Sequence, residues 1–299
     1  MAKSYICVFD CETIPDANLI RKIYGIDGSD EDVSVQAMAL QKEASGSEFL
    51  PVMFHRVVAI SAVMADEYGK FLKVSTMEGK DEREIIAKFL KFINDYNPRL
   101  VSFNGRGFDL PMIMVRAMRY NLNAAAYYES ENKELNKNKW ENYRARYSPK
   151  FHLDLLDFIS DFGSVRGLKH YTLCASLNLP GKYDVHGDQV LELYYAGELD
   201  KINEYCESDV LNTYWLFLKF ELLQANILQD DYINHLNVMS EFLAKNCAHR
   251  GYSEVFCSAI SDELARLSGQ LDYEIKVDKE ALEFSEFDDV RPISKEELN

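Results

Sequence analysis

Two carboxylates stand two residues apart near the amino end of the chain, in the segment VFDCETI at residues 8–14. If this segment is a β-strand, side chains alternate between its faces, so Asp10 and Glu12 project together while Cys11 points to the opposite side. Neighbouring carboxylates repel each other, and a divalent cation such as Mg²⁺ removes that penalty because it prefers oxygen ligands. The pattern therefore indicates either a metal site or two solvated acids at the end of a strand.

A third carboxylate follows a later apolar segment. FNGRGFD ends in Asp109, soon after RLVSFN at residues 99–104, which has the composition of a strand. Gly105 and Gly107 loosen the intervening turn, so Asp109 can be delivered to the junction between this strand and the next helix. The alternative is an ordinary helix N-cap, because aspartate is favoured at that position.

A tyrosine and a fourth carboxylate share one face of a helix late in the chain. Tyr205 and Asp209 are four residues apart in EYCESDV, and residues at that spacing lie one turn apart on the same face. The strongly apolar residues at 210–218 indicate that this helix is buried. A carboxylate beside a buried face requires a partner, which a metal ion would be. A solvated aspartate next to a tyrosine at the edge of the core is the alternative.

These residues need a scaffold in which strands and helices alternate. Hydrophobic periodicity predicts strands at residues 4–10, 56–66, 69–77 and 99–104. It predicts helices at residues 81–98, 108–122, 151–162, 168–179 and 231–248, two more within 189–228 that separate near Gly197, and one within the polar excursion at 27–50. This alternation favours an α/β fold.

Composition restricts the class of protein. The chain has 299 residues, 47% of them hydrophobic, which suffices for one large domain or for a domain with an appendage. No run approaches the roughly 18 apolar residues of a membrane span, and no signal peptide is recognisable. The six cysteines show no zinc spacing, so we expect a cytoplasmic protein with reduced thiols and no membrane association. The net charge of −16 means that nucleic-acid binding must depend on a local basic patch or on metal ions.

In combination the three motifs resemble a known family. D-x-E in FDCETIPD, N-x4-D in FNGRGFDLPMI and Y-x3-D in YCESDVLNTY have the order found in the DEDDy 3′–5′ exonucleases of the RNase H-like superfamily. That superfamily includes the proofreading domains of family A and family B DNA polymerases, and RNase D. The segments HRVVAIS, KWENYRARYS, FHLDLLDF and LNLPGK look like a stand-alone bacterial group related to the family B exonuclease domain. The resemblance covers about residues 4–230.

The resemblance implies an α/β, RNase H-like fold with a mixed five-stranded sheet flanked by helices. We expect residues 1–229 to form this exonuclease domain and residues 230–299 to add a C-terminal helical extension and an acidic tail. From Gly269 onward the chain carries ten acidic and four basic residues, a composition typical of a frayed or disordered end.

The resemblance also implies catalytic roles. Four carboxylates would hold two divalent metal ions, Mg²⁺ or Mn²⁺. Asp10 would bridge both ions, Glu12 and Asp209 would complete the first site, and Asp109 would support the second. Tyr205 would orient the attacking water.

The reaction implied by the resemblance is hydrolysis at the 3′ end of single-stranded DNA or of a 3′ overhang, with release of nucleoside 5′-monophosphates. The chain lacks room for a polymerase domain, so such an enzyme would proofread in trans or trim ends in DNA repair. Two alternatives stay open: the same reaction on RNA, and a non-catalytic nucleic-acid-binding module. The sequence indicates no protein partner.

Residues that bind the nucleic acid are expected beside the carboxylates and in two further segments. They are Thr13, Asn104, Phe108, Trp140, Arg144, Arg146 and Lys182. Residues 130–150 carry six basic and three acidic residues with aromatic rings interleaved, and single-strand binding combines basic side chains with rings in this way. The alternative is a charged surface loop whose aromatics point inward. Asp154 is expected to be a supporting acid rather than a metal ligand.

Overall fold

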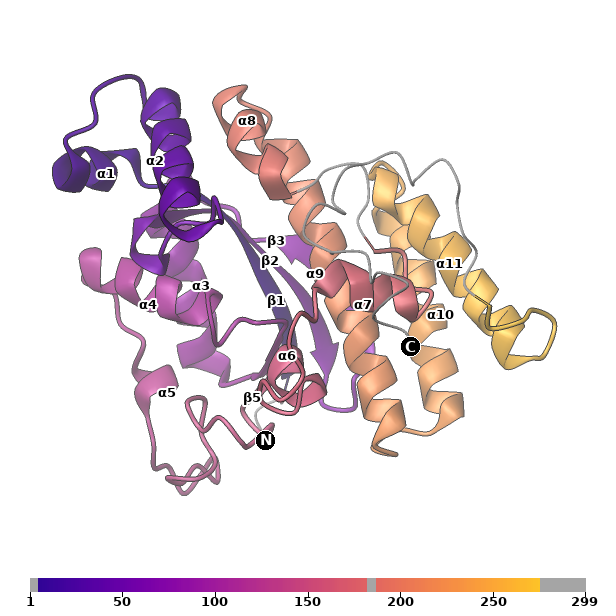
Figure 1. Cartoon of the computed structure of the whole chain (residues 1–299). Coiled ribbons are helices and arrows are strands. Elements are labelled where there is room, and N and C mark those ends of the chain that lie inside the picture. Colours follow the sequence, from indigo (N-terminus) through magenta and orange to yellow (C-terminus); the bar gives the residue numbers. More distant parts are fainter. Residues whose placement is uncertain (1–4, 182–186, 275–299) are drawn as a thin grey trace, which may run out of the picture.

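The computed structural model describes residues 5–181 and 187–274, and its centre is a five-stranded sheet in the order β3-β2-β1-β4-β5 (Figure 1). The strands are β1 (Tyr5–Pro15), β2 (His55–Asp66), β3 (Phe71–Thr76), β4 (Arg99–Ser102) and β5 (His152–Asp154). β2 runs antiparallel to β1 and β3, whereas β4 and β5 run parallel to β1. The expected mixed five-stranded sheet is therefore confirmed.

Strand β1 lies in the middle of the sheet and is buried on both faces. Val8 belongs to the hydrophobic cluster on one face, and Phe9 belongs to the cluster on the other. Cys11 packs on the same side as Phe9, as the predicted alternation requires. The register of β1 against β2 shifts between Glu12 and Thr13, so a bulge lies directly beside the candidate site.

Helices cover both faces of the sheet (Figure 1). Helices α3 (Glu82–Tyr96) and α4 (Asp109–Arg119) supply the cluster that contains Phe9, and α9 (Leu199–Leu223) supplies the cluster that contains Val8. Helix α3 begins as predicted, because the side chain of Asp81 accepts a hydrogen bond from the backbone N–H of Glu84. It ends at Asn97, whose φ of 45° is left-handed.

A buried ion cluster joins the end of β1 to both helices of its face. The Arg116 guanidinium on α4 donates from Nε to Glu82 at 2.7 Å and forms an ion pair with Asp16. Arg119 reaches the same Asp16 carboxylate at 2.8 Å. Because Arg116, Asp16 and Glu82 are each at most 6% exposed, these bonds are screened little by solvent.

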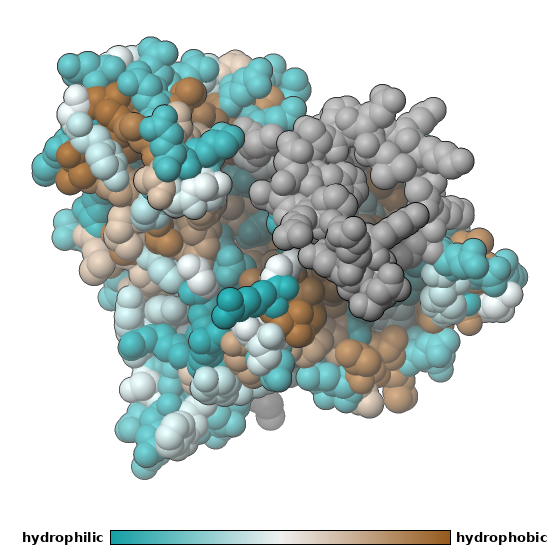
Figure 2. Space-filling view, in the orientation of Figure 1, coloured by the Kyte–Doolittle hydropathy of each residue, from teal (hydrophilic) through white to brown (hydrophobic). Residues whose placement is uncertain are grey.

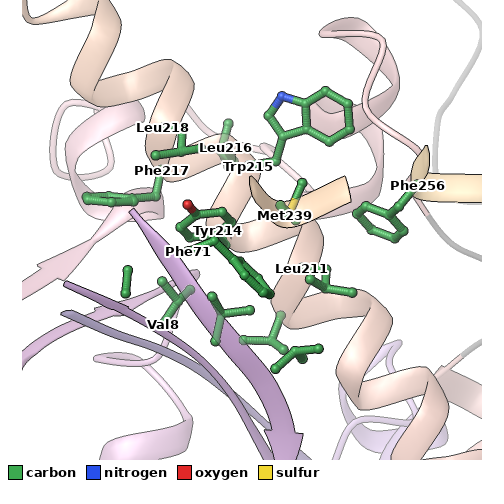
Figure 3. Packing of buried hydrophobic residues seen from close by; sticks show 14 of the residues in the cluster. Val8, Phe71, Leu211, Tyr214, Trp215, Leu216, Phe217, Leu218, Met239 and Phe256 are labelled. Carbon is green, nitrogen blue, oxygen red and sulfur yellow. The ribbon is translucent and has the colours of Figure 1, made fainter. Parts of the chain in front are cut away.

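Two C-terminal helices pack against the sheet and α9. They are α10 (Gln229–Asn246) and α11 (Gly251–Leu267), and α10 lies against β3. Figure 3 shows Tyr214 beside Phe71, with ring centroids 5.4 Å apart, and Trp215 on the same helix. The Trp215 indole N–H donates to the Tyr232 hydroxyl at 2.8 Å, and Tyr232 donates to Glu263 at 3.0 Å. Sheet, α9, α10 and α11 share one hydrophobic cluster, and the division of the chain at residue 229 stays a prediction.

The remaining elements are short or lie between the first two strands. They are α1 (Ala17–Tyr24), α2 (Asp30–Ser45), η1 (Val52–Phe54), α5 (Ala125–Tyr128), α6 (Leu155–Ile159), α7 (His170–Ser176), η2 (Gly187–Gln189) and α8 (Val190–Tyr195). The one helix expected within 27–50 is α2, and α1 was not predicted. The helix predicted at 151–162 is wrong at its start, because this segment first pairs with β4 as the three-residue strand β5.

The cysteines and the apolar content of the helices can be assessed for the part of the chain that the structure describes. All six cysteines lie among the described residues and are free thiols, and five of them are buried. Within residues 5–181 and 187–274, the helices are too short or too polar to cross a membrane. Lys182 and residues 275–299, which hold most of the acidic tail, lie outside the described residues.

Candidate active site

Three carboxylates from two elements meet at one point. Asp10 and Glu12 lie on β1, Asp209 lies on α9, and one oxygen of each carboxylate lies within 4.8 Å of the others. Val8 and Val210, which neighbour these acids in sequence, belong to one hydrophobic cluster. Burial of that cluster holds α9 against β1 and brings together acids that are about 200 residues apart in the sequence.

The fourth carboxylate belongs to the same electrostatic cluster. Asp109 is the first residue of α4 and is 5% exposed. Burial raises the pKa of Asp10 well above its ordinary value, and the charges of Asp109 and Asp209 raise it further. Burial raises the pKa of Asp109 from 3.8 to about 7, and the charge of Asp154 adds to this effect. Without a cation, the site therefore disfavours full ionisation of its acids.

The turn that presents Asp109 is fixed by Asp154 at the end of β5. The Asp154 carboxylate accepts the backbone N–H groups of Asn104 at 2.9 Å and Arg106 at 2.8 Å. A Cβ on Gly105 would lie 2.4 Å from Ser102 Oγ, so this turn requires glycine there. Asp154 thus has the supporting contacts expected of it, and it holds the loop rather than joining the three-acid group.

Tyr205 lies one helical turn before Asp209 and is 5% exposed. Its ring belongs to a small hydrophobic cluster with Ile14 and Val58, so α9 and the end of β1 hold it in place. Burial raises the pKa of the Tyr205 phenol far above its ordinary value, and the charges of Asp209 and Glu12 act in the same direction. The hydroxyl therefore stays protonated beside the acids.

Two of the expected binding residues lie directly beside the acids. Thr13 follows Glu12 in β1, and Thr13 Oγ1 lies 3.0 Å from His55 Nδ1. Phe108 precedes Asp109, and its ring centroid lies 5.0 Å from that of His55. Thr13 and Phe108 therefore both contact His55, and each adjoins one of the acids in the sequence. The third residue of this group, Asn104, is exposed on the turn before Phe108, with a left-handed φ of 64°.

The basic and aromatic loop at residues 129–150 is anchored at the far end of β4. The Tyr143 hydroxyl donates to the carbonyl of Pro98 at 2.6 Å, and Lys137 Nζ donates to Asn97 Oδ1 at 2.7 Å. Tyr143 is fully buried and belongs to the core, so its ring points inward, as the alternative interpretation of this loop expects. Trp140 is 72% exposed, so its ring is accessible on the surface.

Arg144 and Arg146 of the same loop contact different parts of the protein. The Arg146 guanidinium donates to Asp157 at 2.7 Å, and Asp157 also pairs with Arg106 at 3.4 Å in the turn that carries Asp109. Arg144 lies over the ring of Tyr128, 5.2 Å from its centroid. Arg146 is thus connected to the turn before α4 through Asp157, whereas Arg144 faces α5.

Sequence reasoning missed a buried acid between Tyr205 and Asp209. Glu207 is 7% exposed and accepts hydrogen bonds from Thr76 at 3.0 Å and from the Tyr252 hydroxyl at 2.9 Å. These bonds tie α9 to β3 and to α11. The sequence could have revealed Glu207, because it lies in a helix that continues with strongly apolar residues. An acid in such a buried helix requires hydrogen-bond partners.

Comparison with known proteins identifies the family. Residues 47–260 match the family described as a predicted 3′–5′ exonuclease related to the exonuclease domain of PolB. The chain belongs to this family. Membership in the PolB-related exonuclease family confirms the expected relation to the family B exonuclease domain and the expectation of an enzyme of the nuclease class. The matched range includes Asp109, Tyr205 and Asp209 and begins after Asp10 and Glu12.

Two DNA polymerases are similar to this member of the PolB-related exonuclease family. A DNA polymerase of Archaeoglobus fulgidus is 26% identical over 136 residues, which are 45% of this chain and 17% of the polymerase. The structure of the family B DNA polymerase of Pyrobaculum calidifontis aligns with 86% of this chain and 27% of its own, with a TM-score of 0.44 and 15% identity. The chain thus spans less than a third of either polymerase.

Proposed function

We propose that this protein removes nucleotides from the 3′ end of single-stranded DNA by metal-dependent hydrolysis and releases nucleoside 5′-monophosphates. The observation that carries the proposal is the convergence of Asp10, Glu12 and Asp209, with carboxylate oxygens within 4.8 Å of one another. Family membership supports the exonuclease reaction and a nucleic-acid substrate. The expected biological settings are proofreading in trans and the trimming of ends in DNA repair.

The donor atoms of the site fit a hard divalent cation. Asp10, Glu12, Asp109 and Asp209 offer carboxylate oxygens, which suit Mg²⁺ and Mn²⁺. The raised pKa of Asp10 has the same implication, because a cation relieves the repulsion that Asp109 and Asp209 exert on it. We propose that Asp10, Glu12, Asp109 and Asp209 would hold two such ions. When bound, they would supply a nucleophilic water and positive charge for the reacting phosphate.

The protein's own side chains then have distinct roles in the proposal. Tyr205, held protonated by burial and by the neighbouring acids, orients the water that attacks the phosphate. Thr13 and Phe108 adjoin Glu12 and Asp109 in the chain, Asn104 lies on the turn before Phe108, and all three contact the terminal nucleotide. In this proposal the reacting phosphate lies between the carboxylates and the nucleotide-binding residues.

Residues further from the acids would bind the strand upstream of its 3′ end. Trp140 offers an exposed ring, and Arg146 is half-exposed near the turn that carries Asp109. Arg144 pairs its charge with the ring of Tyr128, an arrangement that suits stacking with a base. Lys182, outside the described residues, is proposed as a further phosphate contact.

DNA is the proposed polymer because the similar protein of Archaeoglobus fulgidus is named a DNA polymerase. This argument is an analogy, since the 2′-hydroxyl is what distinguishes RNA at a binding site. The choice between the polymers is therefore left to the experiment. RNA shortened faster than DNA of matched sequence would replace DNA in the proposal.

The test is a gel time course on single-stranded DNA and RNA of matched sequence, labelled at the 5′ or the 3′ end. Each polymer is incubated with Mg²⁺, with Mn²⁺ or with EDTA, and Asp10→Ala serves as the inactive control. We expect stepwise shortening from the 3′ end that requires metal and is absent in Asp10→Ala. Shortening that Asp10→Ala retains would assign the activity to a contaminant or to other residues, and intact polymers in every lane would refute the proposal.

A further inference from the structure

Three aromatic rings from two parts of the chain gather next to Asp109, which follows one of them in the sequence. The centroid of Phe49 lies 4.9 Å from that of His55 and 5.0 Å from that of Phe108, and His55 and Phe108 are 5.0 Å apart. Phe49 is nevertheless 58% exposed. We call these three residues the ring cluster. Phe49 and His55 have no role in the proposed function above.

Phe49 comes from the segment that returns the chain from α2 to β2. The next residue, Leu50, is 3% exposed and belongs to a hydrophobic cluster with Ile20 and Val33, which lie in α1 and α2. Phe49 is not part of that cluster. In Figure 2, hydrophobic and hydrophilic residues alternate over the region of α1 and α2. Leu50 therefore anchors the segment, and the Phe49 ring is left on the surface.

His55 links this segment to β1 through both of its ring nitrogens. Nε2 lies 3.0 Å from the carbonyl oxygen of Leu50, which can only accept, so Nε2 carries the proton. In the neutral ring Nδ1 is then an acceptor, and the Thr13 hydroxyl donates to it at 3.0 Å. Burial lowers the pKa of His55, which favours this neutral form. The imidazole thus fixes the backbone next to Phe49 relative to Thr13.

The ring cluster is linked to two of the acids through neighbouring residues. Phe108 directly precedes Asp109, and His55 accepts a hydrogen bond from Thr13, which follows Glu12. A nucleotide whose phosphate reaches these carboxylates therefore has its sugar and base close to the rings. A base offers a flat apolar face, and an exposed aromatic ring gains by covering one in a way that tolerates any sequence.

We infer that Phe49, together with Phe108, forms the stacking site for the base of the 3′-terminal nucleotide, with His55 as a positioning residue. The inference rests on the proposed function, because it assumes that a 3′ end enters the carboxylate cluster. It assigns a substrate-binding role to the segment between α2 and β2. It also predicts that the site accepts each of the bases, since stacking does not read their hydrogen-bonding edges.

The test measures binding and hydrolysis of two oligonucleotides that differ only in whether the 3′-terminal nucleotide carries its base. Dissociation constants come from fluorescence anisotropy in EDTA, which protects the probe, and kcat/KM comes from the gel assay with Mg²⁺. We expect Phe49→Ala to weaken binding of the normal end by about 5- to 150-fold, the usual effect of removing a stacking ring. For the abasic end the variant and the wild type should bind alike.

Two control variants separate stacking from general damage to the protein. Phe49→Tyr keeps a ring at the position and should bind the normal end nearly as the wild type does. Tyr68→Ala removes a ring that is 73% exposed on the turn between β2 and β3, and it should leave both dissociation constants unchanged. Equal losses on the two oligonucleotides in Phe49→Ala would overturn the inference, as would no loss on either. If binding depends on Phe49 and on the terminal base but the wild type does not hydrolyse the oligonucleotide, the proposed function is refuted and the stacking site is still supported.

Discussion

Replacing Asp109 by asparagine should stabilise the protein when metal is absent. The Asp109 carboxylate is 5% exposed, and burial raises its pKa from 3.8 to about 7. Because the pKa is higher in the folded state, folding favours the protonated acid. The stability that this group contributes is complete below its unfolded pKa and is lost as the pH rises through the folded value. The free energy of unfolding should therefore fall between about pH 4 and pH 7 on account of Asp109.

The size of the effect follows from the same values. The difference between 3.8 and about 7 corresponds to about 4 kcal/mol at a pH above both values. Asparagine cannot ionise and escapes this penalty. It also removes a negative charge from the first turn of α4, which costs at most about 1 kcal/mol. We therefore expect Asp109→Asn to gain about 3 kcal/mol at about pH 8, and well under 1 kcal/mol at about pH 4.

The assay is urea denaturation in EDTA at these two pH values. With an m-value of about 3 kcal/mol per M, the midpoint of Asp109→Asn should rise by about 1 M at the higher pH. Saturating Mg²⁺ should reduce the difference in urea midpoint between Asp109→Asn and the wild type, because Mg²⁺ stabilises the wild-type site more than the variant. Asp95→Asn, which removes an exposed acid on α3, is the matched control and should change stability by less than about 0.5 kcal/mol. If Asp109→Asn does not increase the free energy of unfolding, or increases it equally at both pH values, then Asp109 does not have the raised pKa of a buried acid.

Three further predictions concern other parts of the molecule. Tyr205→Phe should lower kcat about 100-fold while Mg²⁺ still raises the thermal midpoint as in the wild type, and an unchanged kcat would remove the hydroxyl from the mechanism. Arg116→Leu should cost about 3–5 kcal/mol in urea denaturation, because Asp16 and Glu82 would lose their buried partner, and a loss below about 1 kcal/mol would contradict this. Trp140→Ala should weaken single-stranded DNA binding about 5-fold or more without loss of stability, and unchanged anisotropy would exclude Trp140 from the binding surface.

Local patterns predicted the elements that carry the acids, and long-range contacts explain what was missed. The alternation of β1 and the four-residue spacing on α9 placed three acids correctly on their elements, because both depend on backbone geometry alone. Strand β5 was predicted as helix, since three residues are too few to show a period and only pairing with β4 makes them a strand. Whether the rings of residues 130–150 point inward or outward stayed open, because composition does not reveal the bond of the Tyr143 hydroxyl to Pro98.

The ring cluster lay beyond sequence reasoning for a related reason. Phe49 and Phe108 are 59 residues apart in the sequence, and neither belongs to a periodic pattern that would connect them. Their contact depends on the register of β1 against β2, in which Pro15 pairs with His55. A hydrogen-bonded register can be inferred only when turn length fixes it, and 39 residues separate these two strands.

Helix α9 carries both site residues and core residues, so the number of residues between them cannot change. Asp209 faces the carboxylate cluster, and Trp215, further along the same helix, is fully buried in the core. One residue added or removed between them would rotate one end of the helix by about 100° relative to the other. The core or the site would then lose its alignment. The turn at 224–228, which joins α9 to α10, lies beyond both contacts, so variation in chain length among relatives should be concentrated in such turns rather than in α9.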